Sequence, residues 1–236
     1  MSIFERLFFE PAGGMFREFD GVKTFLEPKD HVAYRKLLPQ LLTMPDAPVV
    51  LIFFANYMGV YPWPMTRYQE WAVALKCVFR GEESWHVAIM AVTKWVPMKG
   101  GRYLGFPKYI PDDISLIHVG NCWNAQSRYK GKVQLALEFQ PGINRPLAQW
   151  ENELIGQNSF FSDYIFQLVP PARGPRVQKV NLEHQRPPSW APVPGMVKLS
   201  IDPSEPWAEL VPAETLSPGV YGHFSGGINL VAERLV

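Results

Sequence analysis

The sequence predicts a mainly β fold of the α+β class, in which a curved antiparallel sheet or a closed β-barrel or cone carries one or two short helices. Most segments show the two-residue period of strands. The 23 prolines among 236 residues are spread along the chain and leave little room for long helices. About nine strands are expected, and closure of such a sheet removes exposed edges. We expect a single domain over residues 1–236, because a chain of this length buries one good core.

Two segments carry helix signals. Asp30 is a good N-cap for a helix over residues 31–38, and Pro39 disfavours helical geometry in the residue before it. A second, weaker signal covers residues 147–155 and stops at Gly156.

The predicted strands follow from apolar runs and alternating patterns. The fully apolar run at 49–57 indicates a strand buried on both faces. Residues 80–84 have the length and the glycine of a hairpin loop. The proline-rich stretch 186–194 is interpreted as a long surface connection inside the domain. The expected strands cover residues 49–57, 70–79, 85–95, 114–123, 133–139, 164–169, 177–182, 196–201 and 228–234.

Composition narrows the class of function. The 23 Lys and Arg residues balance 22 Asp and Glu, so we expect no nucleic-acid partner. No apolar run approaches the roughly 18 residues of a membrane span, so we expect no membrane association and a cytoplasmic location. Cys77 and Cys122 lie apart in apolar runs, where cysteine is usually a small buried hydrophobe. The five histidines lack the close spacing of a zinc site.

The segment GGRYLGFPKYIPDDISL, residues 100–116, places Lys108 directly after Gly-Phe-Pro. A lysine is a nucleophile only as the free amine, and its ordinary pKa of about 10.4 leaves roughly one in two thousand neutral at pH 7. Burial in an apolar pocket is one way to suppress the charge. A solvated lysine in a turn is the competing interpretation. The neighbours that could form the pocket are Leu104, Phe106, Pro107, Tyr109 and Ile110.

Three stretches resemble the acetoacetate decarboxylase family, which is itself a standard example of an activated lysine. Gly101-Arg102-x-x-Gly105-Phe106-Pro107-Lys108 resembles the family's Schiff-base segment, which ends on the nucleophilic lysine. Tyr68-Gln69-Glu70 resembles its Tyr-x-Glu, and Leu38-Pro39 resembles the dipeptide after its first helix. The resemblance covers residues 25 to 140 and implies the family's fold, no cofactor, and a homo-oligomer.

The resemblance also implies roles for particular residues. Lys108 would attack a ketone or keto acid and lose water to give a protonated imine, which draws electrons from an adjacent bond. Glu70 would face the amine and carry a proton, and Tyr68, two residues earlier on the same face of a strand, could share that task. Arg102 could attract an anionic substrate or hold a structural contact, and the structural role is favoured. The expected substrate-binding residues are Arg102, Phe106 and Tyr109.

Three departures from the family pattern leave the reaction open. The decarboxylases have a second lysine where this chain has Tyr109, and a glutamate where it has Tyr103. Their carboxylate-binding arginine falls near residues 26–28, where this chain has none. Three cations could substitute if the fold brought them inward: Lys23, Lys29 and Arg67.

Three functions therefore remain. Decarboxylation of a β-keto acid is placed slightly ahead, because the lysine segment is nearest to that activity. Some relatives use the same lysine and glutamate for aldol condensation and dehydration of keto acids. A non-catalytic barrel that binds a small molecule is the third, supported by an aromatic content of 14%. The aromatic residues expected around its mouth are Tyr57, Tyr61, Trp63 and Trp71.

Overall fold

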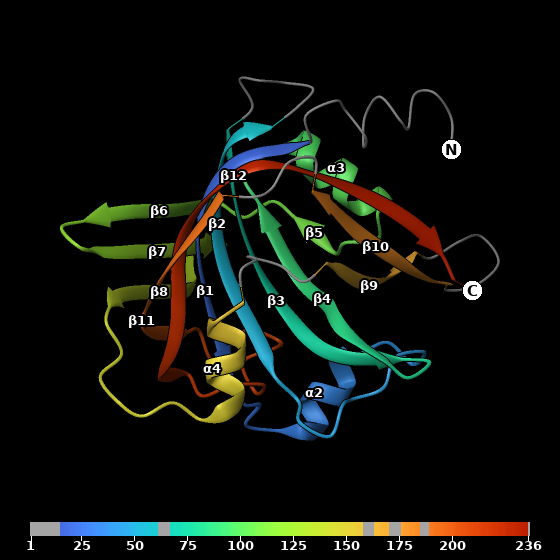
Figure 1. The fold of residues 1–236 in the computed structure, drawn as a ribbon, viewed down its shortest axis with the longest axis horizontal. Helices are drawn as coiled ribbons and strands as arrows, with labels where there is room; N and C mark the ends of the chain where they lie inside the picture. The colour runs from blue at the N-terminus through green and yellow to red at the C-terminus, as the bar shows by residue number, and fades with distance from the viewer. Residues whose placement is uncertain (1–14, 61–66, 158–162, 170–175, 185–188, 236) are drawn as a thin grey trace.

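The computed structural model describes residues 15–60, 67–157, 163–169, 176–184 and 189–235. Within them, twelve strands are hydrogen-bonded into one sheet and three short helices lie around it (Figure 1). The elements are β1 (Phe16–Leu26), α2 (His31–Leu37), β2 (Val50–Val60), β3 (Tyr68–Phe79), β4 (Glu82–Val92), α3 (Trp95–Tyr103), β5 (Lys108–Tyr109), β6 (Asp113–Val119), β7 (Cys122–Tyr129), β8 (Lys132–Pro141), α4 (Gln149–Ile155), β9 (Tyr164–Val169), β10 (Arg176–His184), β11 (Ser189–Ile201) and β12 (Glu214–Arg234).

Seven strands form a closed ring. The order β1-β2-β3-β4-β9-β10-β12 is closed by antiparallel pairing of β12 with β1. The mainly β, strongly curved fold that the sequence predicts is therefore confirmed. The sheet is mixed rather than purely antiparallel, because β4 pairs in parallel with β5 and with β9. Parallel partners need long crossover connections, and both follow β4 through such a connection.

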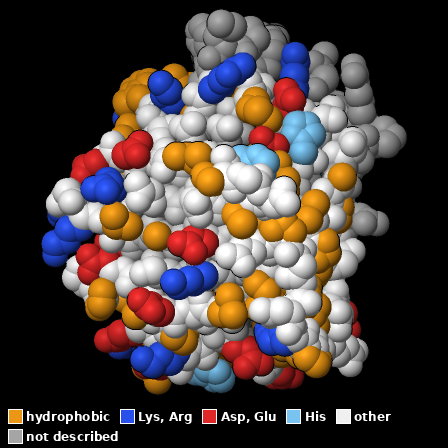
Figure 2. All heavy atoms as spheres, turned by 90° about the vertical axis from the view of Figure 1, so that its left-hand side faces the viewer, with side chains coloured by type: hydrophobic (Ala, Val, Ile, Leu, Met, Phe, Trp, Pro, Cys, Tyr) orange, Lys and Arg blue, Asp and Glu red, His pale blue; other side chains and the backbone are white. Residues whose placement is uncertain are grey.

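The other strands extend the sheet away from the ring. Beyond β12 the order continues through β11, β8, β7 and β6, and β6 to β8 project together to one side (Figure 1). Figure 2 shows that side of the molecule, where basic, acidic and hydrophobic side chains are interspersed. No helix in the described ranges is long and apolar enough to cross a membrane.

One face of the ring strands points into the ring. All seven contribute buried side chains to a single group, which we call the inner cluster. Phe25 of β1 lies 6.3 Å from Trp85 of β4 between ring centroids, although two strands separate β1 from β4. The side chains thus meet across the interior. The inner cluster includes Phe19, Phe25, Phe53, Tyr57, Tyr68, Ala72, Trp85, Met90, Leu104, Phe106, Ile165, Val180, Phe224 and Ile228.

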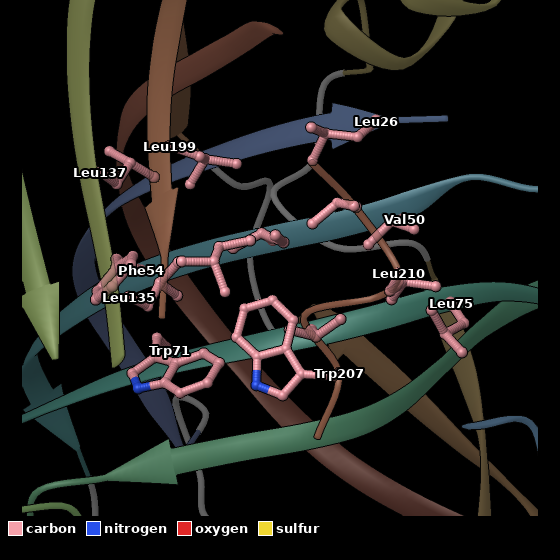
Figure 3. Close-up of a cluster of buried hydrophobic side chains, with 14 of the residues drawn as sticks. Leu26, Val50, Phe54, Trp71, Leu75, Leu135, Leu137, Leu199, Trp207 and Leu210 are labelled. Carbon is pink, nitrogen blue, oxygen red and sulfur yellow. The ribbon is translucent and has the colours of Figure 1, made fainter. Parts of the chain in front are cut away.

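The opposite face of the ring packs against the extension of the sheet. Figure 3 shows part of this outer cluster, with Trp71 beside Trp207 at 5.8 Å between ring centroids. Burying so much apolar surface on both faces of the same strands explains why β2 and β3 are apolar almost throughout. The outer cluster includes Val22, Leu26, Ile52, Phe54, Trp71, Val73, Leu135, Leu137, Phe139, Leu199, Trp207 and Leu210.

Both predicted helices are present. The Asp30 carboxylate accepts hydrogen bonds from the backbone of Val32 and Ala33, which caps α2. The helix ends at Leu37, two residues before Pro39. Gly156 follows α4 as its C-cap.

Some predicted elements were wrong in detail. The strand expected over 85–95 ends at Val92, and the missed helix α3 begins at Trp95. The strand expected over 114–123 is two strands, β6 and β7, because Gly120 adopts a positive φ and turns the chain. The hairpin loop expected over 80–84 is a tighter turn at residues 80–81, where both residues adopt positive φ.

The proline-rich stretch is only partly a connection. Residues 185–188 lie outside the described residues, whereas residues 189–194 begin β11 and pair with β12. β8 joins β11 only from Gly195 onward. Within the described residues, Pro192 and Pro194 therefore lie where β11 is paired with β12 alone, and proline is tolerated at an edge that no second strand occupies. β1 has no counterpart among the predicted strands.

Candidate functional site

Lys108 enters the ring along the edge of β4. After α3, Gly105 adopts a φ of +80°, and a Cβ there would lie 2.6 Å from the carbonyl oxygen of Leu168, so glycine is needed for this turn. The chain then forms β5, which pairs in parallel with β4 and sets Lys108 beside Met90. Laterally paired residues point to the same face of a sheet, and Met90 belongs to the inner cluster. Lys108 therefore points into the ring.

The amine of Lys108 meets a carboxylate in the interior. Lys108 Nζ donates a hydrogen bond to Glu70 Oε2 at 2.7 Å. The two side chains are only 8% and 3% exposed, so the pair is almost fully removed from solvent. The second oxygen of Glu70 accepts a hydrogen bond from the Tyr57 hydroxyl at 3.1 Å. A charge-assisted hydrogen bond of this length allows a proton to move directly between amine and carboxylate.

Glycine in α3 makes room for the lysine. A Cβ at Gly101 would lie 2.4 Å from both Cδ and Cε of Lys108. With a Cβ at residue 101, the lysine side chain could not keep its present course. At the adjacent Gly100, a Cβ would meet nothing within 4 Å. Gly101, the glycine of the Gly101-Arg102 pair, thus directly affects the position of the amine.

Arg102 holds the backbone of β5. Its Nε donates to the Lys108 carbonyl at 2.6 Å, and the Lys108 N–H donates to the Phe106 carbonyl at 2.8 Å. Arg102 is exposed, and its Nε bond goes to the backbone of the strand that carries the lysine. This geometry corresponds to the structural alternative considered for Arg102.

Aromatic rings surround the amine. Lys108 Nζ lies 5.7 Å from the Phe106 ring centroid and 6.0 Å from that of Tyr68. Tyr68 stacks on Tyr57 at 4.6 Å between centroids. Burial, followed by the charge of Glu70, raises the pKa of both tyrosines well above the ordinary value. Both phenols therefore stay protonated, and Tyr57 remains a donor to the carboxylate.

The site includes some of the residues predicted from the sequence and not others. Lys108, Glu70, Tyr68 and Phe106 come together on the inner face. Tyr109 does not join them, because adjacent strand residues point to opposite faces; its hydroxyl donates to Gln134 on the outer side.

The aromatic residues expected around the mouth do not gather in one place. Trp71, expected at the mouth, packs in the outer cluster (Figure 3), and Tyr61 and Trp63 lie outside the described residues. Tyr57, also expected at the mouth, is buried in the interior and donates its hydroxyl to Glu70. Its contact with the carboxylate was not predicted, because nothing in the sequence pairs residue 57 with residue 70.

Of the three candidate cations, the fold buries Lys23. It is 1% exposed, whereas Lys29 and Arg67 are exposed. Burial lowers the pKa of Lys23 to about 7. Strand register joins Lys23 to Lys108 in one row, through Phe53 of β2, Ala72 of β3 and Met90 of β4. Residues of one row share a face, so both amines point into the ring.

The site's glycine, lysine and glutamate all lie inside the segment matched by one family model. The model of the acetoacetate decarboxylase family matches residues 28–228. The chain belongs to the acetoacetate decarboxylase family. The resemblance carried by the Gly-Phe-Pro-Lys and Tyr-x-Glu segments is thereby confirmed. No curated protein matches the chain in sequence.

Solved structures of this family and its relatives share the fold. A structure of acetoacetate decarboxylase is 16% identical with a TM-score of 0.72, covering 96% of this chain and 91% of that one. Acetoacetate decarboxylase from Legionella pneumophila is 18% identical with a TM-score of 0.66, covering 99% and 96%. The enduracididine biosynthesis enzyme MppR complexed with pyruvate is 16% identical with a TM-score of 0.68, covering 93% and 90%. At these identities the likeness concerns the fold.

Proposed function

We propose that this protein is a lysine Schiff-base lyase acting on a ketone or keto acid, with Lys108 as nucleophile and Glu70 as proton carrier. The observation that carries the proposal is the 2.7 Å hydrogen bond between two side chains that are both almost fully buried. A buried ion pair is weak evidence for stability, because desolvation offsets much of the attraction. Retaining one beside aromatic walls in the interior is better explained by chemistry.

The pair supplies both requirements of imine formation. Glu70 accepts a proton from the Lys108 ammonium, which frees the lone pair on Nζ. That lone pair forms a bond to the ketone carbon, and loss of water gives a protonated imine. Glu70 gives this proton back as water leaves and is then a carboxylate again. The carbon of the enamine that follows bond cleavage takes a new proton, drawn from water through Glu70, and a further water hydrolyses the imine to release the product. Tyr57 steadies the carboxylate by donating to its other oxygen.

Decarboxylation of a β-keto acid is the favoured reaction, and Lys23 is the residue we assign to the substrate carboxylate. The bond to the carboxyl carbon breaks, its electron pair enters the imine, and carbon dioxide leaves. With a pKa of about 7, Lys23 is protonated in a growing fraction as the pH falls below neutrality. Binding of an anionic substrate should therefore strengthen as the pH falls through 7, and Lys23→Met should raise KM for a β-keto acid without changing KM for a neutral ketone.

Aldol condensation and dehydration is the second candidate. It is favoured by the likeness to MppR, of which structures exist with pyruvate and with the condensation product of pyruvate and imidazole 4-carboxaldehyde. The imine chemistry at Lys108 would be the same. The enamine would attack an aldehyde instead of taking a proton.

Product analysis separates the candidates. The protein is incubated with acetoacetate while carbon dioxide is measured, and separately with pyruvate and an aldehyde while aldehyde consumption is measured. We expect carbon dioxide release, abolished by Lys108→Met and unchanged by Lys99→Met, whose lysine is exposed on α3. Glu70→Gln should slow turnover. Aldehyde consumption without carbon dioxide release would select the aldolase, and ligand binding without either product would leave the non-catalytic barrel.

A further inference from the structure

Gln167 of β9 is a buried amide that makes no side-chain hydrogen bond within the described part of the chain. The residue is 0% exposed, and neither Nε2 nor Oε1 has a partner among the described residues. Gln178, which lies opposite Gln167 on the neighbouring strand β10, is also buried. Its Nε2 donates a hydrogen bond to the Leu104 carbonyl at 2.6 Å. Buried amides are nearly always paired, because leaving them unpaired costs stability. Gln167 thus differs from the other buried glutamine beside it.

The unpartnered amide points into the same interior as Lys108. Ile165 of β9 belongs to the inner cluster, and Gln167, two residues later on the strand, shares its face. β9 and β5 run along the same edge of β4, pairing at Trp85 and at Met90 respectively.

Gln167 also packs directly against the segment that delivers the lysine. A Cβ at Gly105 would lie 3.3 Å from the Gln167 Cβ, and Gly105 stands three residues before Lys108. The base of the Gln167 side chain therefore lies against the loop that carries Lys108 into the ring.

We propose that Gln167 binds the far end of the substrate whose ketone carbon is joined to Lys108, and that this end both accepts and donates hydrogen bonds, as a carboxamide does. This inference rests on the proposed imine chemistry. Nε2 donates and Oε1 accepts, so the complementary group must offer an acceptor and a donor. A carboxylate would satisfy Nε2 only and would set its charge against Oε1.

Ketones that differ only in the group at their far end, here called the tail, test whether Gln167 binds that group. Levulinamide ends in a carboxamide, its isopropyl counterpart has the same shape without polar atoms, and levulinate ends in a carboxylate. Homologues with one and two further methylene groups cover longer reaches. Each ketone is incubated with the protein, the imine is reduced with borohydride, and the adduct is quantified by intact mass. Acetone, which has no tail, measures imine formation alone.

The wild type is expected to trap one carboxamide about tenfold better than its isopropyl counterpart, the ratio that corresponds to about 1.4 kcal/mol. Gln167→Met, which keeps the shape and removes both polar atoms, should abolish that preference and leave acetone trapping unchanged. Equal preference in the wild type and the variant at all three lengths would overturn the proposal, as would a preference for the carboxylate that survives Gln167→Met. Absence of acetone adducts would instead refute the imine chemistry.

Thermal unfolding tests the same proposal without a ligand. Gln167→Met should raise Tm by a few degrees, since it removes an unpaired buried amide, and Gln167→Leu gives a second apolar replacement. Gln178→Met is the matched control and should lower Tm, because it leaves the Leu104 carbonyl without its donor. A fall in Tm for both Gln167 variants would assign Gln167 a structural role and contradict the proposal.

Discussion

Gly101 shows how a single missing side chain sets the geometry of the site. The lysine chain passes where a Cβ would stand, 2.4 Å from Cδ and Cε. A contact that short requires the lysine or the helix to shift, and the lysine is the more mobile group. The 2.7 Å hydrogen bond to Glu70 depends on the lysine keeping its present course.

We therefore expect Gly101→Ala to reduce imine formation at Lys108 by at least about tenfold, the effect of losing one positioned charge-assisted hydrogen bond. Borohydride trapping with acetone measures it. Gly100→Ala is the control, because a Cβ there meets nothing within 4 Å. Equal trapping by both variants would contradict the assigned role of Gly101, and far-UV circular dichroism should show the fold retained in each.

His86 predicts a pH dependence of stability that is independent of the site. It is 6% exposed, and its Nδ1–H donates to the Phe166 carbonyl at 3.0 Å. Burial lowers the pKa of His86 from 6.5 to about 4. Between these values the unfolded chain binds the proton and the folded chain does not, so stability is complete above pH 6.5 and is lost as the pH falls toward 4.

The contribution amounts to about 2 to 3 kcal/mol between pH 7 and pH 4.5. His86→Asn, which keeps an N–H donor but does not titrate, should flatten this part of the curve in urea unfolding. His118→Asn changes an exposed histidine and serves as control. Parallel curves for the wild type and His86→Asn would show that another group controls acid unfolding.

At the scale of elements, α3 and β5 act together. α3 supplies the glycine beside the lysine and the arginine that holds the β5 backbone, while β5 is only two residues long. So short a strand depends on its partners for position. Arg102 is one of these partners, because its Nε donates to the Lys108 carbonyl.

Exchange of Arg102 for lysine distinguishes positioning from substrate binding. Lysine keeps the charge but lacks the directional Nε donor. We expect Arg102→Lys to lower kcat about tenfold for charged and neutral ketones alike, with KM little changed. A KM that rises only for anionic substrates, together with rescue by lysine, would instead make Arg102 an anion-binding residue.

Elements with local signals could be predicted from the sequence. Asp30 and Pro39 delimit α2, and Arg80-Gly81 marks the turn between β3 and β4. α3 was missed because its sequence, WVPMKGGRY, contains proline and two glycines and has little helix propensity. Of its two glycines, Gly101 makes room for the lysine side chain.

At the scale of the whole molecule, ring closure creates an interior that the alternation of polar and apolar residues along the strands does not reveal. β1 was missed because Glu18, Asp20 and Lys23 interrupt its apolar residues, yet Lys23 points inward. Gln167 and Glu70 are likewise polar residues on a buried face. Sequence reasoning treats such positions as solvent-facing, and only the resemblance to a family singled out Glu70. Register and closure, which depend on residues far apart in the chain, reveal the rest.

Closure places two buried amines, Lys23 and Lys108, on one interior face, and we assign the covalent chemistry to Lys108 alone. The most direct measurement is peptide mapping by mass spectrometry after incubation with acetoacetate or pyruvate and reduction with borohydride. We expect an adduct confined to Lys108, absent from Lys23 and lost in Lys108→Arg. An adduct on Lys23, an adduct spread over exposed lysines such as Lys99, or an unmodified Lys108 across a panel of ketones would contradict this assignment.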